Sequence, residues 1–230
     1  MKTRTLARTG ASLLTAGVLA LGGAVAATAA PDSTAAADAA TTTFTAGHTD
    51  IVSVACDANN RITVDTFRED GGHISPANIG NYRFLFDDSN SPADAITYSN
   101  GTWQISGIEQ YEDNLPFIGF QYTEALNPAC PASVSFDVAK VSGAANAGDA
   151  VFTANDAVAG STSSATGDTS RVTLWKPGSG ANRPSHEHGP WTLSAPAAGG
   201  DFTLSFTAYR GGTNAQIGST IAPVNLRVQP

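Results

Sequence analysis

The sequence predicts an all-β fold, an antiparallel β-sandwich in a single domain that follows a cleaved signal peptide. Three observations lead to this class. Short segments along most of the chain alternate apolar and polar residues, glycine, proline, asparagine and aspartate fill the gaps between them, and no later segment has the apolar spacing of an amphipathic helix. Alternation with period two buries one face of a strand and leaves the other in water. Many short strands in one domain are typical of a sandwich.

The first thirty residues read as a secretory signal peptide. Lys2, Arg4 and Arg8 precede an apolar run, and small residues follow it up to Ala29 and Ala30. This order of basic start, apolar core and small-residue cleavage site is the signature of export. We therefore predict a signal peptide over 1–30, a flexible lead-in over 31–43 and the β-sandwich domain over 44–230.

The predicted strands follow one another to the end of the chain. Alternation is clearest where buried positions recur at every second residue, as in Phe202, Leu204 and Phe206. The clearest segments are 133–141, 201–209 and 224–228, and the weaker ones are 61–67, 81–86, 102–108, 117–122, 150–154 and 171–175. Because strand signals continue without a break, we expect one domain and no internal boundary.

The charge and the cysteine content reduce the number of function classes that fit the sequence. The net charge is −8, and removal of a signal peptide with three basic and no acidic residues leaves the rest near −11. Such an acidic surface argues against binding to nucleic acid or to anionic membranes. Two cysteines in an exported chain most simply form one disulfide, so we predict a bond between Cys56 and Cys130. The alternative is a pair of thiolates that hold a metal ion.

The four histidines give the strongest functional signal. His186 and His188 are two residues apart, and so are His48 and Asp50 in the first predicted strand of the domain. Residues i and i+2 of an extended segment point to the same side, and two neutral imidazoles can share one metal ion. Asp50 would be a fourth ligand or would fix a histidine tautomer by accepting its hydrogen bond. The alternatives are solvated loop histidines and a polar pair at a strand edge.

Two further residues belong to this hypothesis. A shared site requires the first strand to run beside the strand that begins at Trp191, and we expect Trp191 to pack beneath the histidines and order them. His73 lies among glycines and is predicted to be a surface turn residue outside the site.

Four stretches carry a resemblance to a known family: AGHTDI, NLPFIGFQYTEAL, VSGAANAGDAVF and SHEHGPWTLSAPAAGGDFTLSFTA, in that order. Together they resemble the actinobacterial surface-anchored protein domain, also called the choice-of-anchor M domain, from about Phe44 to Val228. Its G-H-x-D and H-x-H-x-x-W motifs match His48, Asp50, His186, His188 and Trp191. This chain departs from the pattern in having no visible anchor, in GPW before the strand and in a longer turn after it.

The resemblance implies extracellular work linked to metal uptake, since such domains occur beside ABC transporters of the zinc and manganese type. The expected cofactor is zinc or another divalent transition metal. The expected partners are components of a metal ABC transporter or cell-wall proteins, with no nucleic acid and no membrane insertion after signal cleavage. We expect the mature protein to be secreted and extracellular, either free or associated with the cell wall.

Three function classes follow. The first is a secreted, non-enzymatic transition-metal-binding protein with His48, Asp50, His186 and His188 as ligands. The second is a cell-surface adhesion or glycan-binding module with a structural histidine site, which three exposed aromatic residues in a row would favour. The third is a metal hydrolase, which needs an open coordination position beside a general base. The sequence has no G-x-S-x-G nucleophile motif, so an enzyme is not expected.

Overall fold

A computed structural model describes residues 42–144, 146–153, 158–160, 171–180 and 183–230. The predicted signal peptide and most of the lead-in, residues 1–41, lie outside the described residues. The first strand, β1 (Thr42–Phe44), begins two residues before the predicted domain boundary and pairs with β5 (Tyr82–Asp87). None of the described helices is long and apolar enough to cross a membrane.

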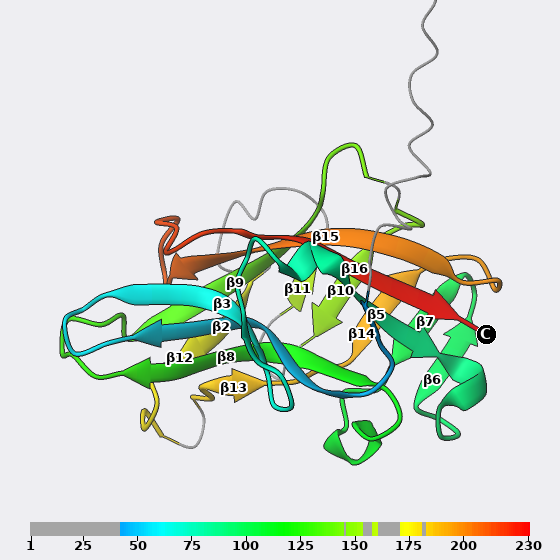
Figure 1. Ribbon diagram of the computed structural model, residues 1–230, viewed down its shortest axis with the longest axis horizontal. Helices are drawn as coiled ribbons and strands as arrows, with labels where there is room; N and C mark the ends of the chain where they lie inside the picture. The colour runs from blue at the N-terminus through cyan, green and yellow to red at the C-terminus, as the bar shows by residue number, and fades with distance from the viewer. Residues whose placement is uncertain (1–41, 145, 154–157, 161–170, 181–182) are drawn as a thin grey trace, which may run out of the picture. The chain divides into compact units, whose positions relative to one another are not determined.

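Strands dominate the structure, which confirms the all-β class, and they form three sheets (Figure 1). The six-stranded sheet has the order β1-β5-β16-β15-β9-β12, where the new members are β16 (Ile221–Gln229), β15 (Gly200–Arg210), β9 (Ser133–Lys140) and β12 (Val172–Trp175). We call the second the site sheet, β13-β8-β2-β3-β4, made of β13 (His186–Glu187), β8 (Pro116–Ala125), β2 (Gly47–Cys56), β3 (Ile62–Arg68) and β4 (Gly72–Ile74).

The third sheet has the order β11-β10-β14-β7-β6 and contains β11 (Val158–Gly160), β10 (Ala150–Thr153), β14 (Trp191–Ser194), β7 (Thr102–Ile105) and β6 (Ile96–Ser99). The described helical turns are single 3-10 turns, η2 (Ile79–Asn81), η3 (Asp88–Asn90) and η4 (Glu109–Tyr111).

The core lies where the three sheets meet, at Phe120 of β8. Its ring contacts Phe136 and Phe206 of the six-stranded sheet at centroid distances of 5.2 and 5.8 Å, and Phe152 of the third sheet at 4.8 Å. All four rings are fully buried. Aromatic contacts of this kind dominate core energetics because each ring removes a large apolar area from water. The inner face of the site sheet is therefore buried in the core, and a functional site can form only on its outer face.

The prediction of a purely antiparallel arrangement is wrong in two of the three sheets. In the site sheet β2 runs parallel to β8, and in the six-stranded sheet β5 runs parallel to both β1 and β16. Alternation reports which face of a strand is buried and carries no information about the direction of its neighbour. Parallel neighbours also need long crossover connections, which strand signals alone do not reveal.

The cysteines form the predicted disulfide. Cys56 ends β2, Cys130 precedes β9, and their Cα atoms are 6.0 Å apart across 74 residues of sequence. The bond ties the buried end of β2 to the segment that enters the six-stranded sheet.

A β-bulge changes the direction of side chains along β2. The register pairs Asp50 with Gly119 of β8 but Val52 with Phe120, so β2 holds one extra residue, Ile51, at this point. The carbonyl of Ile51 accepts a hydrogen bond of 2.8 Å from the hydroxyl of Thr66 on β3. An extra residue in one strand re-aims the side chains on either side of it. As a result, Asp50 faces the outside of the site sheet, while Val52 lies in the core.

Candidate metal centre

The structure brings the predicted ligands together on the outer face of the site sheet. We call His48, Asp50, His186 and His188 the His–Asp cluster, because one side-chain nitrogen or oxygen atom of each lies within 4.8 Å of the corresponding atoms of the others. His48 and Asp50 come from β2, and the H-x-H segment, residues 186–188, lies on the far side of β8. The cluster therefore reaches across β8 and joins β2 to a segment more than 130 positions later in the sequence.

The strand that carries the H-x-H segment differs from the predicted one. Trp191 begins β14 in the third sheet, whereas His186 and Glu187 form the separate edge strand β13, which pairs with β8. The expectation that β2 runs beside the strand of Trp191 is therefore wrong. His188, Gly189 and Pro190 connect the two strands, so one segment contributes to two sheets.

Gly119 allows the cluster to close across β8. Antiparallel pairing sets His186 opposite Gln121 and Glu187 opposite Phe120, so His188 follows opposite Gly119, which also pairs with Asp50 on its other side. A Cβ atom at Gly119 would lie 2.7 Å from Cγ and Nδ1 of His188 and 2.3 Å from the carbonyl oxygen of Glu187. Such distances are too short for any side chain. A glycine within a strand marks this kind of close approach.

Short contacts join the four side chains. Oδ1 of Asp50 lies 2.8 Å from Nε2 of His186 and 3.1 Å from Nε2 of His188, and the two Nε2 atoms are 2.9 Å apart. Nε2 of His48 is buried without a hydrogen-bond partner and lies 3.6 Å from Oδ2 of Asp50. Nitrogen and oxygen ligands of one tetrahedral zinc ion would be roughly 3.3 Å apart, given ligand distances of about 2.0–2.1 Å. The observed spacings bracket that value.

Burial and charge set the protonation of the cluster. Burial would raise the pKa of the Asp50 carboxyl, but hydrogen bonds from His186 and His188 and the proximity of His48 hold it well below its usual range. The nearby carboxylate of Asp50 raises the pKa of His48, and burial lowers the pKa of His188. Asp50 is thus an ionised carboxylate that is 1% exposed, surrounded by imidazoles. A buried anion of this kind requires a compensating cation or proton nearby.

Phe117 packs against the histidines in the way predicted for Trp191. The Phe117 ring stacks on His188 at a centroid distance of 4.1 Å and meets His48 edge-on at 5.7 Å. Trp191 is buried in the core, where its indole donates a hydrogen bond of 3.3 Å to the carbonyl of Ile118 and its ring contacts Phe152. Trp191 therefore supports β8 from beneath, one residue away from the strand positions that face the cluster.

Carboxylates stand beside His48 on the solvent side. Oε2 of Glu69 lies 3.6 Å from Nδ1 of His48, and Glu112 also has a carboxylate oxygen within 4.8 Å of this pair. These residues, with Gly47, Asp70 and Asp113, line a cavity of about 220 Å³. The cavity gives the site an anionic approach, which attracts cations.

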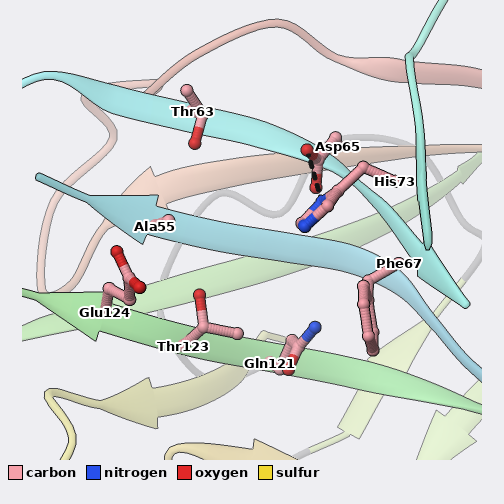
Figure 2. A pocket seen from close by; sticks show the side chains of 8 residues that line it. All are labelled: Ala55, Thr63, Asp65, Phe67, His73, Gln121, Thr123 and Glu124. Atoms are coloured by element: carbon pink, nitrogen blue, oxygen red, sulfur yellow. Dashed lines mark hydrogen bonds and ion pairs between the residues drawn. The ribbon is translucent and has the colours of Figure 1, made fainter. Parts of the chain in front are cut away.

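His73 lies outside the cluster, as predicted, but it is a strand residue and not a turn residue. It belongs to β4, and its Nδ1 is 2.9 Å from Oδ2 of Asp65. Figure 2 shows the two side chains pointing toward each other in a trough of about 500 Å³ on the outer face of the site sheet. The trough is lined by Ala55, Thr63, Asp65, Phe67, His73, Gln121, Thr123 and Glu124.

Comparisons with protein-family models, with curated proteins and with solved structures each return no match. The resemblance to the choice-of-anchor M domain therefore stays a prediction, and the functional argument rests on the geometry of the site.

Sequence reasoning missed Phe117, Gly119 and the carboxylates at His48. Phe117 and Gly119 stand in FIGF, where a glycine interrupts an apolar strand, and that interruption was an available signal of close backbone approach. Glu69 and Glu112 lie in polar loops that resemble any solvated surface segment. Only the fold brings them next to His48.

Proposed function

We propose that this protein is a secreted, non-enzymatic transition-metal-binding protein that works in metal acquisition, with zinc as its ion. The observation that supports the proposal is the convergence of three histidine nitrogens on the buried carboxylate of Asp50. These side chains come from two segments far apart in sequence, and unrelated loop histidines have no reason to meet.

The ligand set favours holding an ion over catalysis. Three neutral imidazoles and one carboxylate supply four protein ligands, which fill the tetrahedral shell that zinc prefers. Catalytic zinc sites keep one position for water, which is what a metal hydrolase would need. Imidazole and carboxylate ligands suit zinc and neighbouring divalent ions of the first transition row. Binding in the cluster would also offset the charge of Asp50.

Export and partners complete the proposal. The disulfide indicates a non-reducing compartment, which agrees with the predicted signal peptide. A secreted metal-binding protein would pass its ion to a component of a metal ABC transporter or to a cell-wall protein, as the resemblance implies.

Zinc titration of the chelator-treated protein tests the proposal. Calorimetry should show one zinc ion per chain for the wild type and for His73→Ala, because His73 lies outside the cluster. The double variant His186→Ala/His188→Ala should lose high-affinity binding, since it removes two of four ligands. Equal affinities in the wild type and the double variant would contradict the proposal.

A glycan-binding module is the alternative, and the trough in Figure 2 is the observation in its favour. Hydroxyl, amide and carboxylate groups line it beside the ring of Phe67, and such groups both donate to and accept from sugar hydroxyls. Against it, the described residues show no row of exposed aromatic rings, and Tyr98 is the sole aromatic among their exposed large hydrophobic side chains. Soluble oligosaccharides that shift NMR signals of trough residues in zinc-free protein would favour this alternative.

A further inference from the structure

We propose that His186 is the exchange ligand of the metal centre, the ligand that leaves first and whose place an imidazole of an acceptor protein takes during transfer of the ion. This inference rests on the proposed function. It concerns how the ion is released, whereas the four-ligand cluster concerns how the ion is held.

The four ligands differ in exposure: two are nearly buried, and two form the solvent-facing side of the cluster. The side chains of Asp50 and His188 are 1% and 5% exposed, and those of His48 and His186 are 20% and 43% exposed. An incoming ligand approaches a bound ion from the solvent side. The structure therefore presents His186 to an acceptor before any other member of the cluster.

Packing distinguishes His186 further. Phe117 holds both His188 and His48, and Asp50 lies on β2, which has a neighbour on each side. Every hydrogen bond and ring contact described for the His186 side chain is with another member of the cluster. Among the described residues, the hydrogen bonds and ring contacts that hold the ring of His186 thus all lie within the cluster.

The backbone of His186 is also the least supported. β13 has two residues, stands at the edge of the site sheet and pairs with β8 alone. The adjacent hydrogen bond of 2.7 Å from the Tyr122 amide to the Ser185 carbonyl extends this pairing by one residue. Segments with few buried contacts at a sheet edge open at low cost in free energy. Small movements of β13 would withdraw His186 and leave the other three ligands in place.

The negative charge on the solvent-facing side of the cluster favours an incoming ligand that is neutral. Glu69 and Glu112 beside His48 repel thiolates and carboxylates, whereas an imidazole enters without a charge penalty. In the exchange the bond from the metal to Nε2 of His186 breaks and a bond to the acceptor's imidazole nitrogen forms. Both donors are neutral, so no proton or electron has to move.

Chemical rescue with free imidazole tests this assignment, with cobalt(II) as a spectroscopic probe of coordination. His186→Gly should still bind cobalt, and added imidazole should restore the visible absorption of the wild-type complex. His188→Gly is the matched control, because the His188 side chain is 5% exposed and stacked against Phe117, so we expect free imidazole not to reach its place. Release of zinc to an excess of a chromogenic chelator should be at least roughly tenfold faster from His186→Ala than from wild type, since affinity changes appear mostly in dissociation rates.

A measurement on the wild type covers the case in which a glycine variant fails to fold. In the zinc-loaded wild-type protein, diethylpyrocarbonate should modify His186 before His48 and His188, as read by mass spectrometry. Modification of His48 or His188 first, or equal rescue of the two glycine variants, would overturn the assignment while zinc binding stands. Failure of the wild type to bind zinc or cobalt would instead overturn the proposed function and this inference with it.

Discussion

Gly119 determines how closely the H-x-H segment approaches Asp50. The variant Gly119→Ala should keep the fold, because β13 lies at an edge and can shift, but it should weaken zinc binding by at least roughly tenfold, the lower end of what a displaced partner around a metal ligand costs. The added methyl group would sit 2.7 Å from the His188 ring and force it away from the ion.

Gly71→Ala is the control for this prediction, because a Cβ atom there would meet Arg68 at an ordinary 3.7 Å. Calorimetric titration of both variants provides the measurement. If Gly119→Ala and Gly71→Ala bound zinc equally well, the close approach across β8 would not matter for the site.

Protons should compete with zinc for the same nitrogen atoms. The pKa of His48 is raised above its ordinary value of 6.5 by Asp50, so this ring keeps its proton to a higher pH than a free imidazole does. Acidification therefore weakens binding, beginning above pH 6.5 as His48 becomes protonated, whereas Asp50 stays ionised throughout. Zinc affinities measured at intervals between about pH 8 and 5.5 should fall steadily. Constant affinity over this range would show that the histidines are not the ligands.

At the scale of single residues, spacing carried most of the information about the site. His48 with Asp50 and His186 with His188 were predictable because residues i and i+2 share a face of any extended segment. The role of Phe117 was not predictable, because an aromatic residue in an apolar run is usually a core residue. Trp191 also lies closer in sequence to the H-x-H segment. Proximity in sequence pointed to the wrong ring, because β14 turns away into another sheet.

Among the elements, β2 joins the His–Asp cluster to the disulfide. His48 stands near one end and Cys56 at the other, roughly 26 Å apart at the rise per residue of a strand. The variant Cys56→Ala/Cys130→Ala should lose up to about 4 kcal/mol of unfolding free energy, as the chain-entropy model gives for a loop of this length. Zinc binding should persist in folded protein, because the bond is remote from the cluster.

Guanidinium unfolding of the double cysteine variant and of the oxidised wild type measures this difference. A midpoint that does not move would mean that strain in the native bond cancels its effect on the unfolded chain.

The strand signal was clearest where one face of a strand is buried and weaker where both are. In β15 the buried residues Phe202, Leu204 and Phe206 alternate with partly exposed ones, and the pattern alone identifies the strand. In β2 seven of ten residues are buried, and the alternation disappears. β13 is too short for any pattern, and its pairing with β8 is set by the cluster and by Gly119.

At the scale of the whole molecule, composition and alternation predicted one all-β domain, but not the order or direction of its strands. Sheet order depends on which strands meet in the core, and Phe120 joins three sheets through residues that are distant in sequence. The parallel pairing of β2 with β8 places His48 and Asp50 next to the strand that β13 joins. The site is thus a consequence of topology as much as of its motifs.

The bulge at Ile51 changes which residue positions of β2 face the solvent and which face the core. His48 and Asp50 occupy even positions and face outward, while Val52, Val54 and Cys56 also occupy even positions and face inward. In a regular strand, residues two apart share one face, so even positions could not offer both ligands to solvent and a cysteine to the core. Deletion of Ile51 would remove the bulge and restore regular alternation, with Asp50 still facing outward and Val52 still facing inward. The bulge therefore lets β2 hold one residue more than a regular strand would between the outward-facing ligands and the inward-facing Cys56.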